Sequence, residues 1–157
     1  MVENIINQMI TLTEQKIECL KIILYLKPKQ KEAIKEENMD DIGSTIDSIQ
    51  TQINIIDEID SRYMLKLNEL KSNANIENIT QLDDIKHSKS RKLKDNISKI
   101  TSLLQQIKIL DDENSLMINE KFQETKEMLK NLRQGKKMAK GYLSDYNSST
   151  IFIDERN

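Results

Sequence analysis

The sequence predicts an all-α protein, an elongated antiparallel helical hairpin or bundle of three long, coiled-coil-like helices. Charged residues make up 32% of the 157 residues, and only three Gly and one Pro are present. Sheets and barrels need such turn formers at every reversal of the chain. The 24 Ile residues argue against a disordered chain. Apolar residues recur in steps of three and four, which is the spacing of a helix face. We expect one helical domain over residues 1–157.

The first helix is expected over about residues 2–37. One apolar row contains Ile6, Ile10, Thr13, Ile17, Leu20 and Leu24, and a second row beside it includes Cys19. Two adjacent rows give the wide apolar stripe of a bundle helix. Pro28 lacks an N–H group and disfavours helix at the residue before it, so we expect a kink near residue 28.

The second helix is expected over about residues 40–71. Asn38 and Asp41 form an N-terminal capping pattern, and residues 72–75 carry the strongest loop signal of the chain. The apolar row is Ile42, Ile46, Ile49, Ile53, Ile56, Asp60, Tyr63, Leu67 and Leu70. This row places Ile53 in the core, so Ile53→Asp should unfold the protein.

The third helix is expected over residues 78–143, followed by an irregular tail over 144–157. It starts near Asn75 or Asn78, the latter heading a capping pattern with Gln81. An unbroken helix over 78–143 would be roughly 99 Å long, against roughly 48 Å for the second helix. The third helix therefore either breaks near residues 111–114 or extends past its neighbours. Either way, apolar residues after about 118 have fewer partners within the chain.

The charge distribution favours a pairing of the second and third helices. Residues 32–69 contain ten acids and three bases, whereas residues 86–110 contain seven bases and one acid. The net charge of −2 gives no reason to expect nucleic acid as a partner. The basic stretches 86–99 and 130–140 lack interleaved aromatic residues, which favours a solvated or helix-facing role.

Three polar residues interrupt the apolar rows. Asp60, Asp111 and Asn114 could fix the register of the helices from core positions. Alternatively, each helix is rotated slightly, so that Ile59 or Leu110 points inward instead. Both interpretations remain open at this point.

The sequence offers little for catalysis, so we expect no enzyme, no metal and no cofactor. It contains one His and one Cys, no Gly-rich phosphate loop and no Ser/His/Asp set. Cys19 is expected as a small buried or half-buried filler and His87 as an exposed helix residue. The longest apolar run, residues 22–26, is far shorter than a membrane span. Because nothing resembles a signal peptide, we expect a cytoplasmic protein.

The C-terminal part of the chain is the candidate for partner binding. Its apolar residues include several Met and Tyr, which suit a helix face that accepts a partner segment. The candidate residues are Asn114, Met117, Ile118, Phe122, Leu129, Leu132, Met138, Tyr142 and Tyr146. The alternative is that the tail folds back on the first helix and completes the bundle.

Several segments together resemble the FlgN family of flagellar export chaperones over nearly the whole chain. The first is residues 24–62, with Ala33-Ile34, Asn38-Met39-Asp40, Ile53, Ile56 and Arg62. The second is LDDENSLMI over 110–118, in which Asp111 stands where Asn is common and Asn114 matches. The third is Tyr142 or Tyr146 followed by Ile151-Phe152-Ile153-Asp154-Glu155-Arg156, which is similar to the tails of Gram-positive members.

The resemblance implies a cytoplasmic helical chaperone for two hook–filament junction proteins. It would bind their C-terminal segments through its C-terminal helical part and deliver them to the flagellar type III export gate. A tail Tyr contributes to docking on the export gate in the family, and Tyr142 and Tyr146 are the two candidates. We expect a monomer or weak dimer, with no nucleic acid and no stable membrane insertion.

Two other functions compete with this one. A sister flagellar chaperone of the FliT or FliS kind has a similar charged helical composition but different clients. A self-associating coiled-coil structural protein would use the same heptad rows to bind a second copy. An enzyme working with carboxylates alone is a more distant third.

Overall fold

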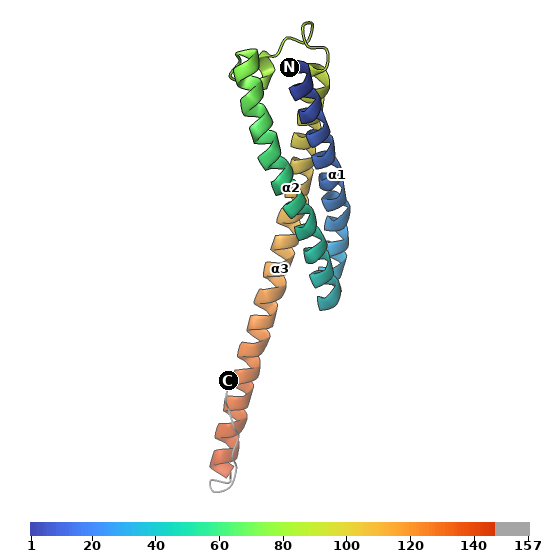
Figure 1. Ribbon diagram of the computed structural model, residues 1–157. Helices are drawn as coiled ribbons and strands as arrows, with labels where there is room; N and C mark the ends of the chain where they lie inside the picture. Colours follow the sequence, from blue (N-terminus) through green and yellow to red (C-terminus); the bar gives the residue numbers. More distant parts are fainter. Residues whose placement is uncertain (147–157) are drawn as a thin grey trace. The chain divides into compact units, whose positions relative to one another are not determined.

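The computed structural model describes the backbone of residues 1–146 and the side chains of residues 1–138 (Figure 1). The elements in chain order are α1 (Val2–Lys35), α2 (Met39–Ala74), the short 3-10 helix η1 (Ile79–Gln81) and α3 (Ser90–Tyr146). No strand occurs among the described residues, so the all-α prediction is confirmed. The chain divides into two compact units, Met1–Ser115 and Leu116–Asn157. The first unit contains α1, α2, η1 and the beginning of α3.

A tight turn joins α1 to α2. Glu37 adopts a left-handed conformation with φ of 55°, and the Asn38 N–H donates back to the Ala33 carbonyl over 3.0 Å. This geometry satisfies the last carbonyls of α1 and stops the helix two residues earlier than expected. Asn38 then caps α2, since its side chain accepts a hydrogen bond from the Asp41 N–H. The predicted N-cap is confirmed, and α1 continues as helix through Pro28.

The third helix begins later than expected. Asn78 and Gln81 do form the predicted capping box, but it heads only the three residues of η1. Leu82 then turns extended and is buried, and residues 82–89 form turns instead of helix. The prediction of a helix from residue 78 is therefore wrong, because burying Leu82 holds this segment out of the helical conformation. The other end of α3 lies at Tyr146 instead of 143.

Asp84 anchors the start of α3. Its carboxylate accepts hydrogen bonds from the Ser90 hydroxyl and the Lys94 ammonium group. These two hydrogen bonds hold the pKa of Asp84 below its ordinary value. His87 lies in the turn before Ser90, with Nδ1 at 3.0 Å from Glu3 Oε1, so its expected place in a helix is wrong.

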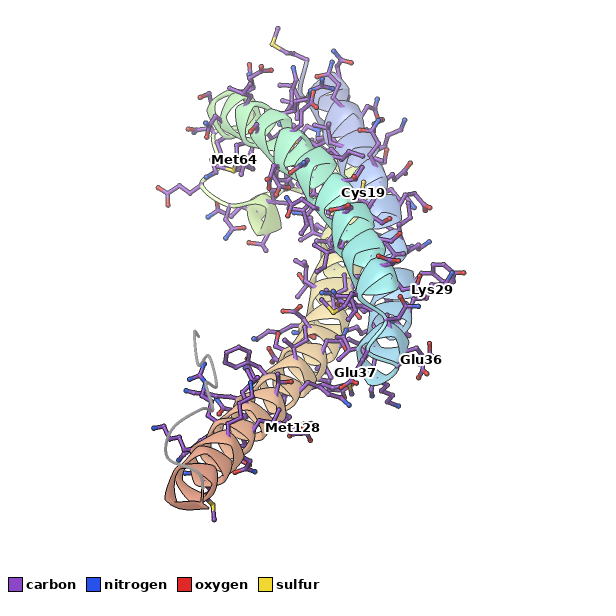
Figure 2. All side chains as sticks on the ribbon, turned by 90° about the horizontal axis from the view of Figure 1, so that it is seen from below. Cys19, Lys29, Glu36, Glu37, Met64 and Met128 are labelled. Carbon is purple, nitrogen blue, oxygen red and sulfur yellow. The ribbon has the colours of Figure 1, made fainter. Side chains whose placement is uncertain are left out.

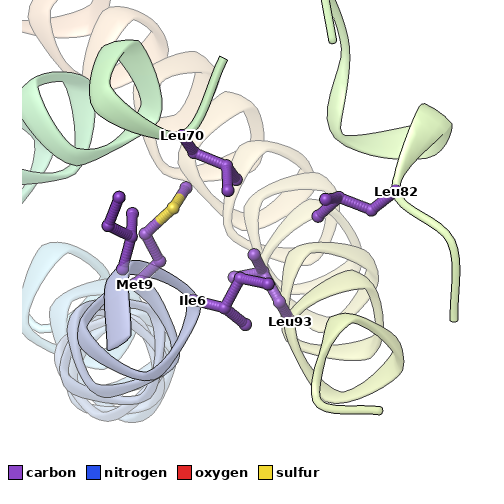
Figure 3. Close-up of a cluster of buried hydrophobic side chains, with 6 residues drawn as sticks. Ile6, Met9, Leu70, Leu82 and Leu93 are labelled. Atoms are coloured by element: carbon purple, nitrogen blue, oxygen red, sulfur yellow. The ribbon is translucent and has the colours of Figure 1, made fainter. Parts of the chain in front are cut away.

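The main core cluster joins α1, α2, the 75–89 connection and α3 (Figure 3). Its buried members are Ile5, Ile6, Met9, Leu70, Leu82 and Leu93. Figure 3 shows Leu82 directed from the connecting segment toward Leu93 and Ile6. The cluster therefore closes one end of the unit, where the beginning of α1, the end of α2 and the beginning of α3 meet.

A second cluster shows how α2 is rotated. Ile59 is only 6% exposed and packs with Leu12 and Cys19, whereas Asp60 lies at the edge of the interface and not in the core. Ile53 is 37% exposed, so its predicted place in the core is wrong. The rotation allows Asp60 to pair with Lys16 at the surface instead of being buried. Cys19 is buried, as expected for a small filler, and burial raises the pKa of its thiol.

Polar contacts hold α1 and α3 in a parallel register. The Asn96 amide donates to the Thr13 hydroxyl over 3.0 Å, and both side chains are buried. Further along, Lys27 Nζ lies 2.7 Å from Asp111 Oδ1. Asn114 donates to the Lys27 carbonyl over 3.0 Å and to Gln30 Oε1 over 3.1 Å. These contacts join residues 83 to 87 apart in sequence, and the near-constant spacing means that the two helices run in the same direction.

The ion pairs between helices differ from those expected. Those that the described residues make all involve α1: Lys16–Asp60 with α2, and Lys27–Asp111 and Lys31–Glu113 with α3. The segments 32–69 and 86–110, expected to pair by opposite charge, share no ion pair in the described part of the chain. Some of their charged side chains pair elsewhere instead, as Asp60 does with Lys16 of α1 and Lys94 with Asp84.

Replacing Ile59 by Asp should lower the free energy of unfolding by several kcal/mol, because the charge would be buried against Leu12 and Cys19. Ile53→Asp is the matched control and should cost much less, since that side chain reaches solvent. Urea unfolding followed by circular dichroism measures both. Equal losses would contradict the observed rotation of α2.

Asn114→Asp should destabilise the protein by about 2–4 kcal/mol. A carboxylate at this position cannot donate, and it would oppose the two oxygens that the amide now bonds. Asn119→Asp makes the same chemical change at an exposed site of α3 and should be nearly neutral. Thermal and urea unfolding compare the two variants, and similar stabilities would show that Asn114 does not hold α1 against α3.

Alkaline pH should weaken the fold through Tyr63. Burial raises the pKa of its phenol to about 12, so the unfolded chain loses this proton at lower pH than the folded one. Stability therefore falls as the pH rises from about 10 through 12, by at most about 3 kcal/mol. Tyr63→Phe should remove this part of the decline, while Tyr25→Phe, at an exposed site, should not. Identical slopes of unfolding free energy against pH in both variants would contradict this.

Candidate partner-binding surface

The C-terminal unit carries an apolar row on one face of α3. The row consists of Ile118, Phe122, Leu129 and Leu132, whose spacing keeps them within about 80° of the helix circumference. Their exposed fractions are 42%, 65%, 51% and 61%. Soluble proteins rarely leave large apolar side chains aligned in this way without a partner. These exposed fractions agree with the expectation that apolar residues after about 118 have fewer partners, as far as the described residues show.

Methionines extend the row on one side. Met117 is half-buried and Met128, labelled in Figure 2, is exposed. At about 100° per residue, both lie on the same flank of the row. Flexible thioether side chains adapt to differently shaped apolar partners. Met138 is also exposed but lies nearly opposite the row, so the helix does not bring this predicted residue to the same face.

Asn114 precedes the apolar row by about one helical turn but, unlike the row, is buried. It belongs to the first unit, is only 2% exposed and bonds α1 through Lys27 and Gln30. Its Oδ1 is buried without a hydrogen-bond partner among the described residues. Of the two interpretations of the polar residues, Asn114 fits the register role. Asp60 and Asp111 instead reach the surface and pair with lysines of α1.

The side chains of the two predicted tyrosines lie outside the part of the chain that the structure describes. Tyr142 and Tyr146 are part of α3, but their side chains lie outside the described residues. The tail from residue 147 lies outside them as well, and with it the predicted Ile151-Phe152-Ile153 segment. The choice between a partner-binding tail and one folded on the first helix stays a prediction.

Two of the depressions in the first unit are partly lined by residues of the apolar rows, and the sequence analysis did not anticipate them. One, of about 170 Å³, is lined from all three helices by residues including Leu12, Tyr63 and Ile100. The other, of about 480 Å³, lies between Leu67, Ile97 and the 77–80 connection. The residues involved belong to apolar rows that indicate a closed core. Only the packing of the helices shows that these positions stay open.

A metal centre or a membrane-spanning helix would be another kind of functional feature in the described residues. Among them, no three His, Cys, Asp or Glu side chains come together in a way that could hold a metal ion. Among the described residues, no helix is long and apolar enough to span a membrane. The exposed apolar row is the candidate surface for partner binding.

Comparison with known proteins identifies the family of the chain. Neither the curated proteins nor the solved structures yield a match to the chain. A family model, described as FlgN protein, matches residues 1–150. The match spans α1, α2, η1 and α3, including the whole apolar row. The chain therefore belongs to the FlgN family, a family of flagellar export chaperones.

Proposed function

We propose that the protein binds the C-terminal helical segments of hook–filament junction proteins and delivers them to the flagellar type III export gate. Membership of the FlgN family supports the general role of an export chaperone. The observation that carries the finer proposal is the exposed row of Ile118, Phe122, Leu129 and Leu132 on α3. The proposed site of action is the cytoplasm, where clients await export.

An amphipathic client helix would lie along the apolar row. Residues at i, i+3, i+4 and i+7 of the client would contact the row, as helices in grooves commonly do. Burying apolar surface contributes about 25 cal/mol per Å², and losses of freedom on binding offset much of it. Micromolar affinity corresponds to only about 8 kcal/mol, which such a row can supply. Binding of this strength shields the client and still permits release.

No chemical step is needed for this cycle. The client is held by apolar contact and released by transfer to the export gate, so the chaperone itself needs no nucleotide, metal or cofactor. Tyr142 and Tyr146 remain the candidates for docking on the gate, and we propose that one of them contributes to it. The free chaperone is proposed to be a monomer or weak dimer, because its row must stay available to the client.

The double variant Leu129→Asp/Leu132→Asp should abolish client binding without changing helical content or melting temperature. Both side chains are exposed, so their replacement removes apolar contact with a partner and leaves the core intact. Titration calorimetry with synthetic C-terminal segments of the two junction proteins, with flagellin's segment for comparison, measures the loss. Circular dichroism measures the melting temperature.

Met64→Asp/Leu65→Asp is the matched control for this experiment. These two residues are similarly exposed, at 51% and 65%, but lie on α2 in the first unit. The control variant should bind clients like the unaltered protein. Loss of binding in both variants, or an equal fall in melting temperature for the Leu129/Leu132 variant, would contradict the proposal. Binding of the flagellin segment alone would indicate a sister chaperone instead.

A further inference from the structure

We propose that the client helix carries a line of carboxylates along one edge, which lies over Lys126 and Arg133 of α3. This inference rests on the proposed function and adds the chemistry and orientation of the partner. It follows from the residues that border the apolar row on its two sides. The row thereby selects its partner by charge and fixes which edge of the partner faces which edge of α3.

The row has the register of a heptad repeat. Ile118, Phe122, Thr125, Leu129 and Leu132 follow one another in alternating steps of four and three residues. In such a repeat, the positions directly beside the apolar seam decide which charged partners fit. Asn119, Lys126 and Arg133 occupy these positions on one side of the row, and Lys121, Met128 and Gly135 occupy them on the other.

The first side of the row is cationic. Lys126 and Arg133 are exposed, and neither has an ion-pair partner among the residues that the structure describes. Lys130 and Lys137 lie one position further out on the same side. No acid occurs between residues 128 and 138, so nothing in this stretch of α3 neutralises the edge. An incoming helix meets positive charge along this side.

The second side of the row is neutral and flat over its C-terminal half. Met128 contributes a flexible apolar side chain, and an added Cβ at Gly135 would meet nothing within 4 Å. A partner helix can approach closely here with apolar or small residues. The two borders of the row are therefore unlike, and only one orientation of an acidic edge brings its carboxylates to Lys126 and Arg133.

A second copy of the chain fits this surface poorly. In a parallel pair of rows, Lys121 of one copy would face Lys126 of the other. In an antiparallel pair, Lys126 would face its own counterpart. The acids of this segment, Glu120, Glu124 and Glu127, occupy outer positions of the repeat and cannot compensate. The borders thus disfavour self-association and favour a partner of opposite charge.

Two synthetic amphipathic helices of about four heptads test the inference. Both carry Leu at the seam positions, and one has Glu and the other Lys at the bordering positions. The Glu peptide should bind about tenfold more tightly at low ionic strength, because it gains exposed ion pairs where the Lys peptide meets repulsion. Added salt should reduce the difference. Titration calorimetry on the full chain measures both affinities.

Charge reversal supplies the decisive comparison. Lys126→Glu/Arg133→Glu should invert the preference between the two peptides. Lys130→Glu/Lys137→Glu changes the net charge equally, but at outer positions, and should keep the preference. Equal affinities for the two peptides, or inversion by both variants, would overturn the inference. A stable dimer in light scattering that Leu129→Asp/Leu132→Asp dissociates would overturn it too, by making a second copy the occupant.

The same titrations separate this inference from the proposed function. Binding of the natural junction segments together with no charge preference among the synthetic peptides would overturn the acidic edge alone. A clear preference for the Glu peptide together with no binding of any junction segment would overturn the proposed client. The acidic edge would then describe another partner of the same row.

Discussion

The parallel register of α1 and α3 is the constraint on which the rest of the first unit depends. Buried amide N–H groups need hydrogen-bond acceptors, and those of the Asn96 and Asn114 side chains find acceptors on α1. A slip of one helical turn would leave both amides unpaired in the interior, each at a cost of about 1–3 kcal/mol. Apolar rows alone tolerate such a slip because each turn resembles the next. Several registers would bury a similar amount of apolar surface, and the polar contacts therefore select one of them.

This register also places Asn114 opposite the last turns of α1. Gln30, the partner of Asn114, lies only five residues before the end of α1 at Lys35. The turn to α2 follows at once, since Glu37 and Asn38 close one helix and open the next. Asn114 therefore bonds α1 within about two turns of the C-terminal end of that helix.

Family membership and surface chemistry support one kind of activity. The FlgN family model spans nearly the whole chain, and a chaperone needs a surface that binds and releases without catalysis. We propose for this role the row of large apolar residues on α3 that core packing does not use. Its two borders differ in charge, so binding can be selective without a deep pocket. Helix-on-helix contact of this kind suits clients whose own helices would otherwise associate early.

The sequence by itself determined the features that depend on local interactions. The helical class, the cap at Asn38 and the exposed row after residue 118 follow from the spacing and type of neighbouring residues. Tertiary structure decided the features that depend on residues far apart in the chain. The burial of Leu82 delayed α3 to Ser90, and the pairing of Asp60 with Lys16 turned Ile59 inward and Ile53 outward. A helix can rotate by a fraction of a turn without changing its sequence pattern, so only the partner across the interface sets which side faces in.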